Sequence, residues 1–393
     1  MRVTCVSFGA EGDLRPLLAL SAGLKAAGHE AVVVAEESGA VLAAAAGVEF
    51  VGLVGDIGDV LSTGVRRARL RLRWPDREWL ETIAGAAAGS DVVVGLAAAS
   101  YHAAAAAEQV GALAILAGLQ PTLPTAEFVP SVLGKPRLPA RLNHAVGRFV
   151  DEVEWSVAGM RVNAGRRELG LPPLPNPYDA SPVLGAWSPL LVPPPADWDA
   201  SQVTVTGQWH PAGGAAFSPS PELAAFLHSE ERPLYVGFGS LKGPQVAYAL
   251  ESVLRAYAGT YRIVLSAHPS ITTELPKSVL RVTGVPHDWL FPRCGALVHH
   301  CGAGTTHAAA RSGVPSVPVP FTLDQRFWAD RLHQLGVASS PVDPRSGWEA
   351  YTAPLRATVA AREPAAALAA RMASEDGVTR AIAEIERRAA ERV

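Results

Sequence analysis

The chain has 393 residues, a formal net charge of −3 at pH 7 and an isoelectric point near 6.4. This length fits two domains of roughly 150–200 residues each, and a hydrophobic content of 49 % is enough to bury two cores. The near-neutral balance argues against nucleic acid or an acidic membrane surface as a partner, because both require a basic surface.

Cysteine use and hydropathy predict a soluble, cytoplasmic protein. Cys5, Cys294 and Cys301 are too few for a disulfide framework. The apolar start, Met1 to Phe8, is too short for a signal peptide, and no uninterrupted apolar run approaches the roughly 18 residues of a membrane span. We therefore expect no stable membrane insertion. Abundant alanine, with arginine favoured over lysine, indicates a GC-rich bacterial source.

Strand and helix patterns alternate through the first half of the chain. A helix is predicted from Leu14 to Gly28, with Pro16 near its first turn, and a second helix ends at Gly47. This βαβ repetition predicts a parallel sheet with helices on both faces. The predicted strands are residues 3–8, 31–35, 48–53, 91–96 and 112–117.

Proline and glycine accumulate between residues 188 and 232, around a short predicted strand at 202–207, and predict a linker at 209–220. A second α/β series follows, so the economical fold class is α/β with two doubly wound domains. Its predicted strands are residues 233–240, 261–267, 279–284, 296–300 and 316–321. A terminal helix rich in Glu and Arg is expected over 377–393.

The stretch from Val298 to Gln325 carries the most chemistry. A strand ends there, the chain turns through glycines, and a helix is predicted to begin near Thr305. Glycines allow close backbone approach, and a helix start offers unpaired N–H groups and partial positive charge. A Walker-type loop would need a lysine, which is absent, so this cradle suits a diphosphate. Asp324 and Gln325 follow the next strand, where they are placed to bind sugar hydroxyls.

This stretch resembles the donor signature of inverting family 1 glycosyltransferases, especially the bacterial branch that glycosylates antibiotic aglycones and the sterol glucosyltransferases. The resemblance extends through residues 282–306 and to residues 8–34. It implies the GT-B fold, in which two Rossmann-like domains face each other across a cleft. Residues 1–208 would bind the acceptor, 209–220 link the domains, 221–376 bind the nucleotide-sugar, and 377–393 pack back on the first domain.

The resemblance also implies residue roles. Asp13 would be the general base, Val285 would read the nucleobase, and Asp324 and Gln325 would hold the donor sugar. Ser240 lies in a GFGS loop like the one that contacts the donor phosphates in this family. The expected diphosphate-binding residues are Ser240, His300, Gly302, Ala303, Gly304, Thr305 and Thr306.

A carboxylate base takes the acceptor proton as the acceptor oxygen attacks the anomeric carbon. Because aspartate is a weak base toward alcohols, Asp13 favours phenolic acceptors. Glu11 is a rival carboxylate in the same loop, and without the resemblance Asp13 would be interpreted as a helix cap. Two long segments, 64–79 and 120–139, are candidate acceptor-binding loops. The first is rich in arginine, and a solvated helix face is its default interpretation.

The donor base stays open between UDP and dTDP. Many relatives have a ribose-binding glutamate where this chain has Ala308, and plant relatives have a stacking tryptophan where it has Gly284. Neighbouring His299, His300 and Cys301 lack the partner spacing of a zinc site, so we expect neither a metal nor another cofactor. The loop at 237–243 falls one residue short of the dinucleotide fingerprint, which argues against a dehydrogenase.

The sequence therefore predicts an inverting hexosyltransferase that moves a hexose or deoxyhexose from a UDP- or dTDP-sugar to a hydroxyl of an apolar natural-product aglycone. Two alternatives remain. A nucleotide-sugar 2-epimerase shares the fold but needs no acceptor. A non-catalytic protein that binds nucleotide-sugar and assists another transferase would not need Asp13.

Overall fold

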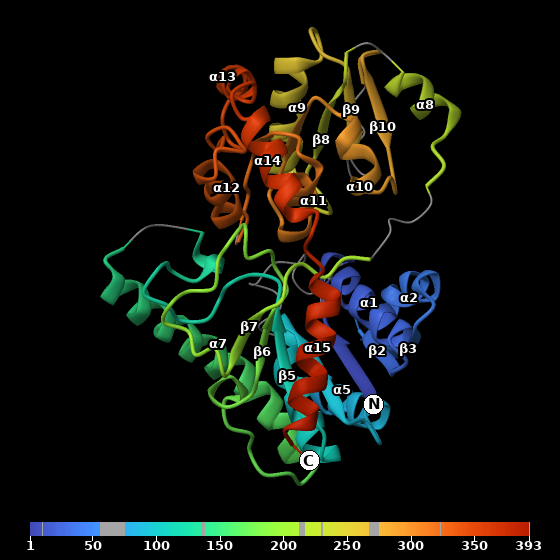
Figure 1. Ribbon diagram of the computed structural model, residues 1–393, viewed down its shortest axis with the longest axis vertical. Helices are drawn as coiled ribbons and strands as arrows, with labels where there is room; N and C mark the ends of the chain where they lie inside the picture. The colour runs from blue at the N-terminus through green and yellow to red at the C-terminus, as the bar shows by residue number, and fades with distance from the viewer. Residues whose placement is uncertain are drawn as a thin grey trace.

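The computed structural model describes residues 1–9, 11–55, 75–134, 138–211, 217–228, 231–266, 275–322 and 324–392. These residues form two α/β domains stacked along the long axis of the molecule (Figure 1). Each domain is built around one sheet in which all the paired strands are parallel. The predicted fold class, α/β with two doubly wound domains, is confirmed.

The first sheet has the strand order β3-β2-β1-β4-β5-β6-β7. Its inner strands are apolar on both faces because helices cover both sides. In the register of the central pair, Ser7 of β1 lies opposite Leu96 of β4. The strands are β1 Arg2–Ser7, β2 Glu30–Glu36, β3 Glu49–Leu53, β4 Val92–Leu96, β5 Leu113–Gly118, β6 Val183–Gly185 and β7 Val203–Val205.

Helices cover both faces of this sheet. Leu17, Leu20 and Leu24 of α1 fill the core on one face, and Trp79 and Ile83 of α5 fill the core on the other. The helices are α1 Glu11–Ala26, α2 Ala40–Ala46, α5 Asp76–Ala86, α6 Ser100–Val110 and α7 Ala140–Glu168, with short 3₁₀ turns η1 Glu37–Gly39, η2 Ala97–Ala99, η3 Ser131–Leu133 and η4 Pro177–Asp179.

The second sheet repeats this plan with the order β10-β9-β8-β11-β12. Gly237 of β8 lies opposite His299 of β11 at its centre. Its strands are β8 Leu234–Gly237, β9 Ile263–Ser266, β10 Val279–Val282, β11 Ala296–His299 and β12 Ser316–Pro318. Its helices are α8 Pro221–Leu227, α9 Pro244–Tyr257, α10 His287–Leu290, η5 Phe291–Arg293, α11 Ala303–Ser312, α12 Gln325–Gln334, α13 Glu349–Ala357 and α14 Arg362–Met372.

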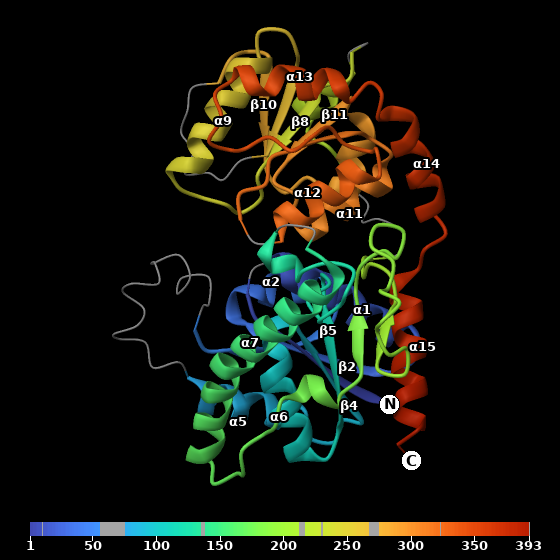
Figure 2. The same cartoon turned by 90° about the vertical axis from the view of Figure 1, so that its left-hand side faces the viewer.

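The last helix, α15 Gly377–Ala390, leaves the second domain and runs along α1 of the first (Figures 1 and 2). Its residues Ile382 and Ile385 join the first-domain core. His29 of the first domain contacts Glu386 Oε1 through Nε2 at 2.8 Å. The second domain is therefore connected to the first by both an outgoing and a returning segment.

Three boundaries differ from the sequence prediction. Helix α1 begins at Glu11, three residues before the predicted start at Leu14, because the loop after β1 turns directly into the helix. Helix α11 begins at Ala303 rather than near Thr305. Trp209, at the predicted start of the linker, is 1 % exposed and lies in the first-domain core. Residues 212–216 of that linker lie outside the described residues.

Candidate functional site

The strand order reverses at one point in each sheet, between β1 and β4 and between β8 and β11. Open parallel sheets bind ligands at such points, outside the carboxyl ends of the strands. The two points face each other. Burial, opposed by the neighbouring Asp288 carboxylate and aided by the guanidinium of Arg15 in the first domain, lowers the pKa of His287 in the second domain to about 4. The first turn of α1 is thus near the start of α10 in the other domain.

In the second domain, two loops meet at the ring of His300. A Cβ added to Gly239, in the β8–α9 loop, would lie 2.9 Å from His300 Cε1, and one added to Gly302 would lie 2.6 Å from Nε2. A side chain at either position would have to displace this imidazole. Burial lowers the pKa of His300 to about 4, with the Gly237 backbone acting in the opposite direction. The unliganded ring is therefore neutral at pH 7.

A buried histidine shapes the turn that precedes α11. Cys301 has a φ of 64°, a left-handed conformation that costs a non-glycine residue about 1–3 kcal/mol. Its N–H donates to His299 Nδ1 at 3.2 Å, and His299 Nε2 lies 3.0 Å from Ser316 Oγ. Because His299 and Cys301 are both fully buried, their role is to hold the loop.

The turn places the first residues of α11 at the carboxyl end of β11. Gly302 is the N-cap residue, and no acidic residue lies in the first turn. The N–H groups of Ala303, Gly304 and Thr305 come too early in the helix to have partners in their own helix, and such helix ends favour anions. Thr306 differs from the expected pattern because it is fully buried, and its hydroxyl meets no partner among the described residues.

Asp324 and Gln325 stand at the start of α12. The Trp328 indole N–H donates to Asp324 Oδ2 at 3.1 Å, and burial raises the pKa of Asp324 to about 6. The same carboxylate raises the pKa of the Cys301 thiol, after burial, which places it near the β11–α11 loop. Gln325 Oε1 accepts the N–H groups of Phe321 and Thr322 at 2.9 and 3.2 Å, so only its amide group is left for a ligand.

The remaining donor candidates also lie at carboxyl strand ends. Ser240 is exposed in the loop after β8. Val285 is partly buried in the turn after β10, which Gly284 forms with a φ of 68°. Ala308 is 5 % exposed, so the position of the relatives' ribose-binding glutamate is occupied here by a core methyl group. The second-domain candidates thus gather at one edge of one sheet.

In the first domain, Asp13 is the third residue of α1 and is partly buried. A Cβ added to Gly9 would lie 2.9 Å from Asp13 Oδ2, so the carboxylate folds back over the end of β1. Glu11 is exposed and pairs with Arg15. A third carboxylate, Glu36, was missed by the sequence analysis. It is 4 % exposed and accepts the Gly9 N–H at 3.2 Å. The sequence signal for this residue was a carboxylate at the end of β2, the strand beside β1.

The two candidate acceptor loops are only partly described. Residues 64–74 lie outside the described residues, and Trp79 at the end of that segment is 2 % exposed in the core. In the second loop, the Phe128 ring lies 5.5 Å from the Phe327 ring of α12, centroid to centroid. That loop therefore reaches the second domain next to the sugar-binding candidates.

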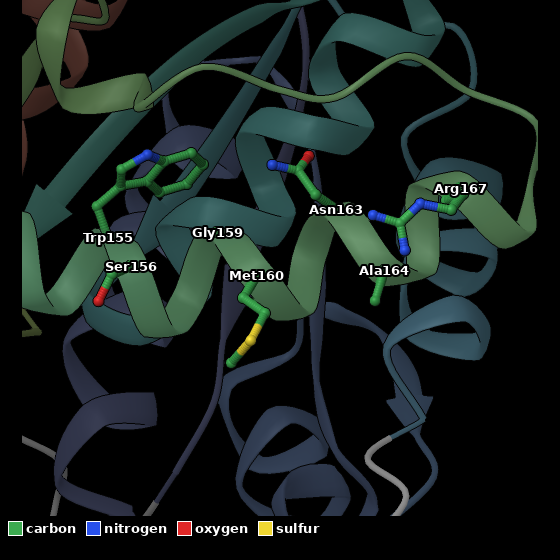
Figure 3. Close-up of a pocket in the computed structure, with 7 residues that line it drawn as sticks. All are labelled: Trp155, Ser156, Gly159, Met160, Asn163, Ala164 and Arg167. Atoms are coloured by element: carbon green, nitrogen blue, oxygen red, sulfur yellow. The ribbon is translucent and has the colours of Figure 1, made fainter.

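Two further features bear on the site. Among the described residues, no three His, Cys, Asp or Glu side chains are arranged to hold a metal ion. An open groove of about 380 Å³ runs along α7 between Trp155 and Arg167 (Figure 3). It lies on the half of α7 that points away from the second domain (Figures 1 and 2), and so it is separate from the facing crevices.

Comparison with known proteins agrees with this geometry. Residues 260–388 match the family described as "Erythromycin biosynthesis protein CIII-like, C-terminal domain". The chain is 33 % identical to the O-mycaminosyltylonolide 6-deoxyallosyltransferase of Streptomyces fradiae, covering 98 % of this chain and 97 % of that protein. It is 30 % identical to the sterol 3-beta-glucosyltransferase of Aspergillus fumigatus, over 98 % of this chain but only 30 % of that longer protein.

Solved structures give the same fold. The spinosyn forosaminyltransferase superposes with a TM-score of 0.73 at 19 % identity, covering 99 % of both chains. That identity supports the GT-B fold alone, whereas the Streptomyces relative matches nearly end to end at 33 % identity. The chain belongs to the family 1 glycosyltransferases of the GT-B fold, and it is a sugar-transferring enzyme of the natural-product and sterol type.

Proposed function

We propose that this enzyme moves a hexose or deoxyhexose from a dTDP-sugar to a hydroxyl of an apolar natural-product aglycone, with inversion at the anomeric carbon. The observation that carries the proposal is the pair of facing crevices, one acidic and one built for an anion. UDP is the second candidate donor, because the sterol relatives are named glucosyltransferases.

In this mechanism the acceptor oxygen attacks the anomeric carbon while Asp13 takes its proton. The bond from that carbon to the diphosphate oxygen breaks, and the diphosphate leaves with the electron pair. Asp13 lies partly buried over the end of β1, whereas Glu11 is exposed and turned to Arg15, and this placement favours Asp13 as the base. An attack opposite to the leaving group gives the inverted product.

The charge that develops on the diphosphate would be stabilised at the second crevice. The first turn of α11 and the His300 ring supply fixed donors there, and fixed donors aimed at developing charge are usually the largest contribution to catalysis. Ser240 and Thr305 add hydroxyls on either side. Asp324 and the Gln325 amide would hold sugar hydroxyls, and the backbone near Val285 would contact the base.

The preference for dTDP rests on Ala308 and on the Streptomyces relative. An alanine cannot bind the ribose hydroxyls as a glutamate would, and dTDP has one ribose hydroxyl fewer than UDP. The relative is named for transfer of a 6-deoxy sugar to O-mycaminosyltylonolide. Ala308 therefore favours dTDP, and the relative makes a deoxysugar the first sugar and that macrolide the first acceptor to try.

A thermal-shift panel with dTDP, UDP, dTDP-glucose and UDP-glucose tests the donor, because a ligand that binds only the folded state raises the unfolding temperature. A larger shift with dTDP than with UDP is the expected result, and the reverse order would replace the donor. Incubation of the preferred sugar donor with O-mycaminosyltylonolide then tests transfer. Sugar isomerised without any acceptor would favour an epimerase instead.

We also propose that transfer needs no metal, because helix N–H groups and neutral donors can neutralise the diphosphate. Full activity in excess EDTA is expected, and loss of activity that Mg²⁺ restores would contradict it.

The three cysteines are free and buried, which supports a cytoplasmic setting. No helix among the described residues is long and apolar enough to cross a membrane.

A further inference from the structure

The segment at residues 187–192, here called the crossover segment, follows β6 of the first domain but packs on the second. Trp187, Leu191 and Val192 are all buried and belong to a cluster with Trp328 of α12 and Met372 of α14. The apolar side chains of the crossover segment therefore pack against α12 and α14 of the second domain. Helix α12 begins at the donor-binding candidate Gln325.

A histidine on α11 is bonded to this segment. His307 Nε2 accepts the Ser188 N–H at 3.0 Å, and Nδ1 lies 2.7 Å from the Ala303 carbonyl oxygen in the first turn of the same helix. Only the neutral ring with its proton on Nδ1 makes both bonds. His307 is 1 % exposed, and burial lowers its pKa to about 3, so this form persists at any working pH.

Ser188 also contacts the returning chain. Its hydroxyl donates to Glu375 Oε1 at 2.8 Å and accepts the Leu190 N–H at 3.1 Å. Glu375 lies between α14 and α15, where the chain goes back to the first domain. The crossover segment and the returning connection therefore meet at Ser188.

The His307 ring also contacts the tryptophan that is bonded to Asp324. The Trp328 ring meets the His307 ring edge-on, with 5.0 Å between centroids, and the Trp328 indole N–H holds Asp324. His307 thus contacts both the first turn of α11 and the tryptophan that holds Asp324.

We propose that His307 is a positioning residue for sugar transfer, which ties the first turn of α11 to Ser188 and so sets where the donor stands relative to Asp13. This inference rests on the proposed function and deepens it. Misplacement of reacting groups by about 1 Å can cost on the order of 100-fold in rate. Loss of this bond should therefore lower turnover more than nucleotide affinity.

Two substitutions separate the two bonds of His307. In His307→Asn the shorter amide can still donate to the Ala303 carbonyl but cannot reach the crossover segment. In His307→Gln the longer side chain can place its oxygen near the Ser188 N–H. His228→Asn is the matched control, because the exposed His228 makes a similar bond to Ala224 four residues earlier, at 3.2 Å, and has no second hydrogen-bond partner among the described residues.

Three quantities are measured on each full-length variant: dTDP affinity by calorimetry, kcat for transfer from dTDP-glucose to O-mycaminosyltylonolide, and amide exchange at Ser188. We expect His307→Asn to lower kcat at least about tenfold, with the dTDP Kd within about twofold of wild type and faster exchange at Ser188. His307→Gln should restore slow exchange and most of the activity, and the control should match wild type.

Unchanged kcat in His307→Asn despite fast exchange at Ser188 would overturn the inference. Parallel losses of unfolding temperature, dTDP affinity and kcat in both variants would also overturn it, since they would show a role in stability alone. Wild-type protein that binds neither dTDP nor UDP would instead refute the proposed function, and this inference with it.

Discussion

The two crevices share a topology but have opposite chemistry. In each sheet the strand order reverses beside the first strand of its domain, and a helix starts there. In the first domain, that helix start carries Glu11 and Asp13, and Glu36 lies behind it. In the second domain, the first turn of α11 has no acidic residue, and glycines and His300 surround it.

This difference shows how one fold supports two roles. The positive end of a helix attracts an anion in either domain, but in the first domain the chain supplies its own carboxylates, so a diphosphate would be repelled. In the second domain that end is left open. The first crevice can therefore hold a base and the second a leaving group, and function follows from the loops rather than from the sheet order.

Removal of the base should have the largest effect. Asp13→Asn is expected to lower kcat by about 10²–10⁴-fold, the range for a general base, with dTDP affinity within about twofold of wild type. Rate measurements at saturating donor check this. Glu11→Gln is the control and should lose far less, because its carboxylate is engaged by Arg15. The opposite order of effects would assign the base to Glu11.

A carboxylate at the start of α11 would give the second crevice the charge of the first. Gly304→Asp should weaken dTDP binding by roughly 10–100-fold, because the new carboxylate faces the diphosphate at the helix start. A Cβ at Gly304 meets nothing within 4 Å, so the substitution itself has room. Gly304→Asn has the same shape without the charge and should bind far better in calorimetry. Equal losses in both would place the diphosphate elsewhere.

The raised pKa of Asp324, about 6, predicts a pH dependence of sugar binding. If the carboxylate accepts sugar hydroxyls, affinity for dTDP-glucose should fall roughly tenfold from pH 7 to pH 5 as it is protonated, whereas affinity for dTDP should not follow it. Calorimetric titrations with both ligands across that range measure the difference. Identical pH profiles for the two ligands would remove Asp324 from the sugar site.

The same group predicts a stability change. Its pKa is higher in the folded than in the unfolded protein, so the folded state binds more protons between about pH 4 and pH 6, and stability falls as pH rises through that window. Asp324→Asn should therefore raise the unfolding temperature at pH 7 while weakening sugar binding. A lower unfolding temperature would show that the bond to Trp328 outweighs the burial of charge.

The smallest expected effect concerns His300. Its pKa of about 4 keeps the unliganded ring neutral, and a bound diphosphate beside it should raise that pKa by favouring the charged form. Binding of dTDP near pH 6 should then take up a fraction of a proton, seen as a binding enthalpy that depends on the buffer. His300→Gln should abolish the buffer dependence, and its persistence would point to another group.

The sequence predicted the parallel strands and the glycine turn before α11 because these features are local. Apolar runs bounded by glycine specify buried parallel strands, and the turn after β11 specifies a helix start at the carboxyl end of the sheet. Strand β6 and the 29-residue helix α7 were missed. The strand is only three residues long, and the helix has a weakly apolar sequence that carries no caps or motif.

Features that depend on tertiary contact could not be predicted in the same way. Thr306 follows Thr305 in a run of candidate donors, but the helix turns its side chain into the core. Gln325 looks like a ligand group, yet its oxygen caps the preceding loop. His307 resembles an ordinary helix residue until Ser188, 119 positions away, is brought to its ring. Such roles arise from distant segments meeting.

The central claim is that the first crevice holds the base and the second holds the nucleotide diphosphate. Calorimetric titrations with dTDP on wild type, Asp13→Asn and Gly304→Asp test it most directly. The account predicts that wild type and Asp13→Asn bind equally and that Gly304→Asp binds at least about tenfold more weakly. Weaker binding by Asp13→Asn, with Gly304→Asp unaffected, would place the nucleotide at the first crevice and contradict the account.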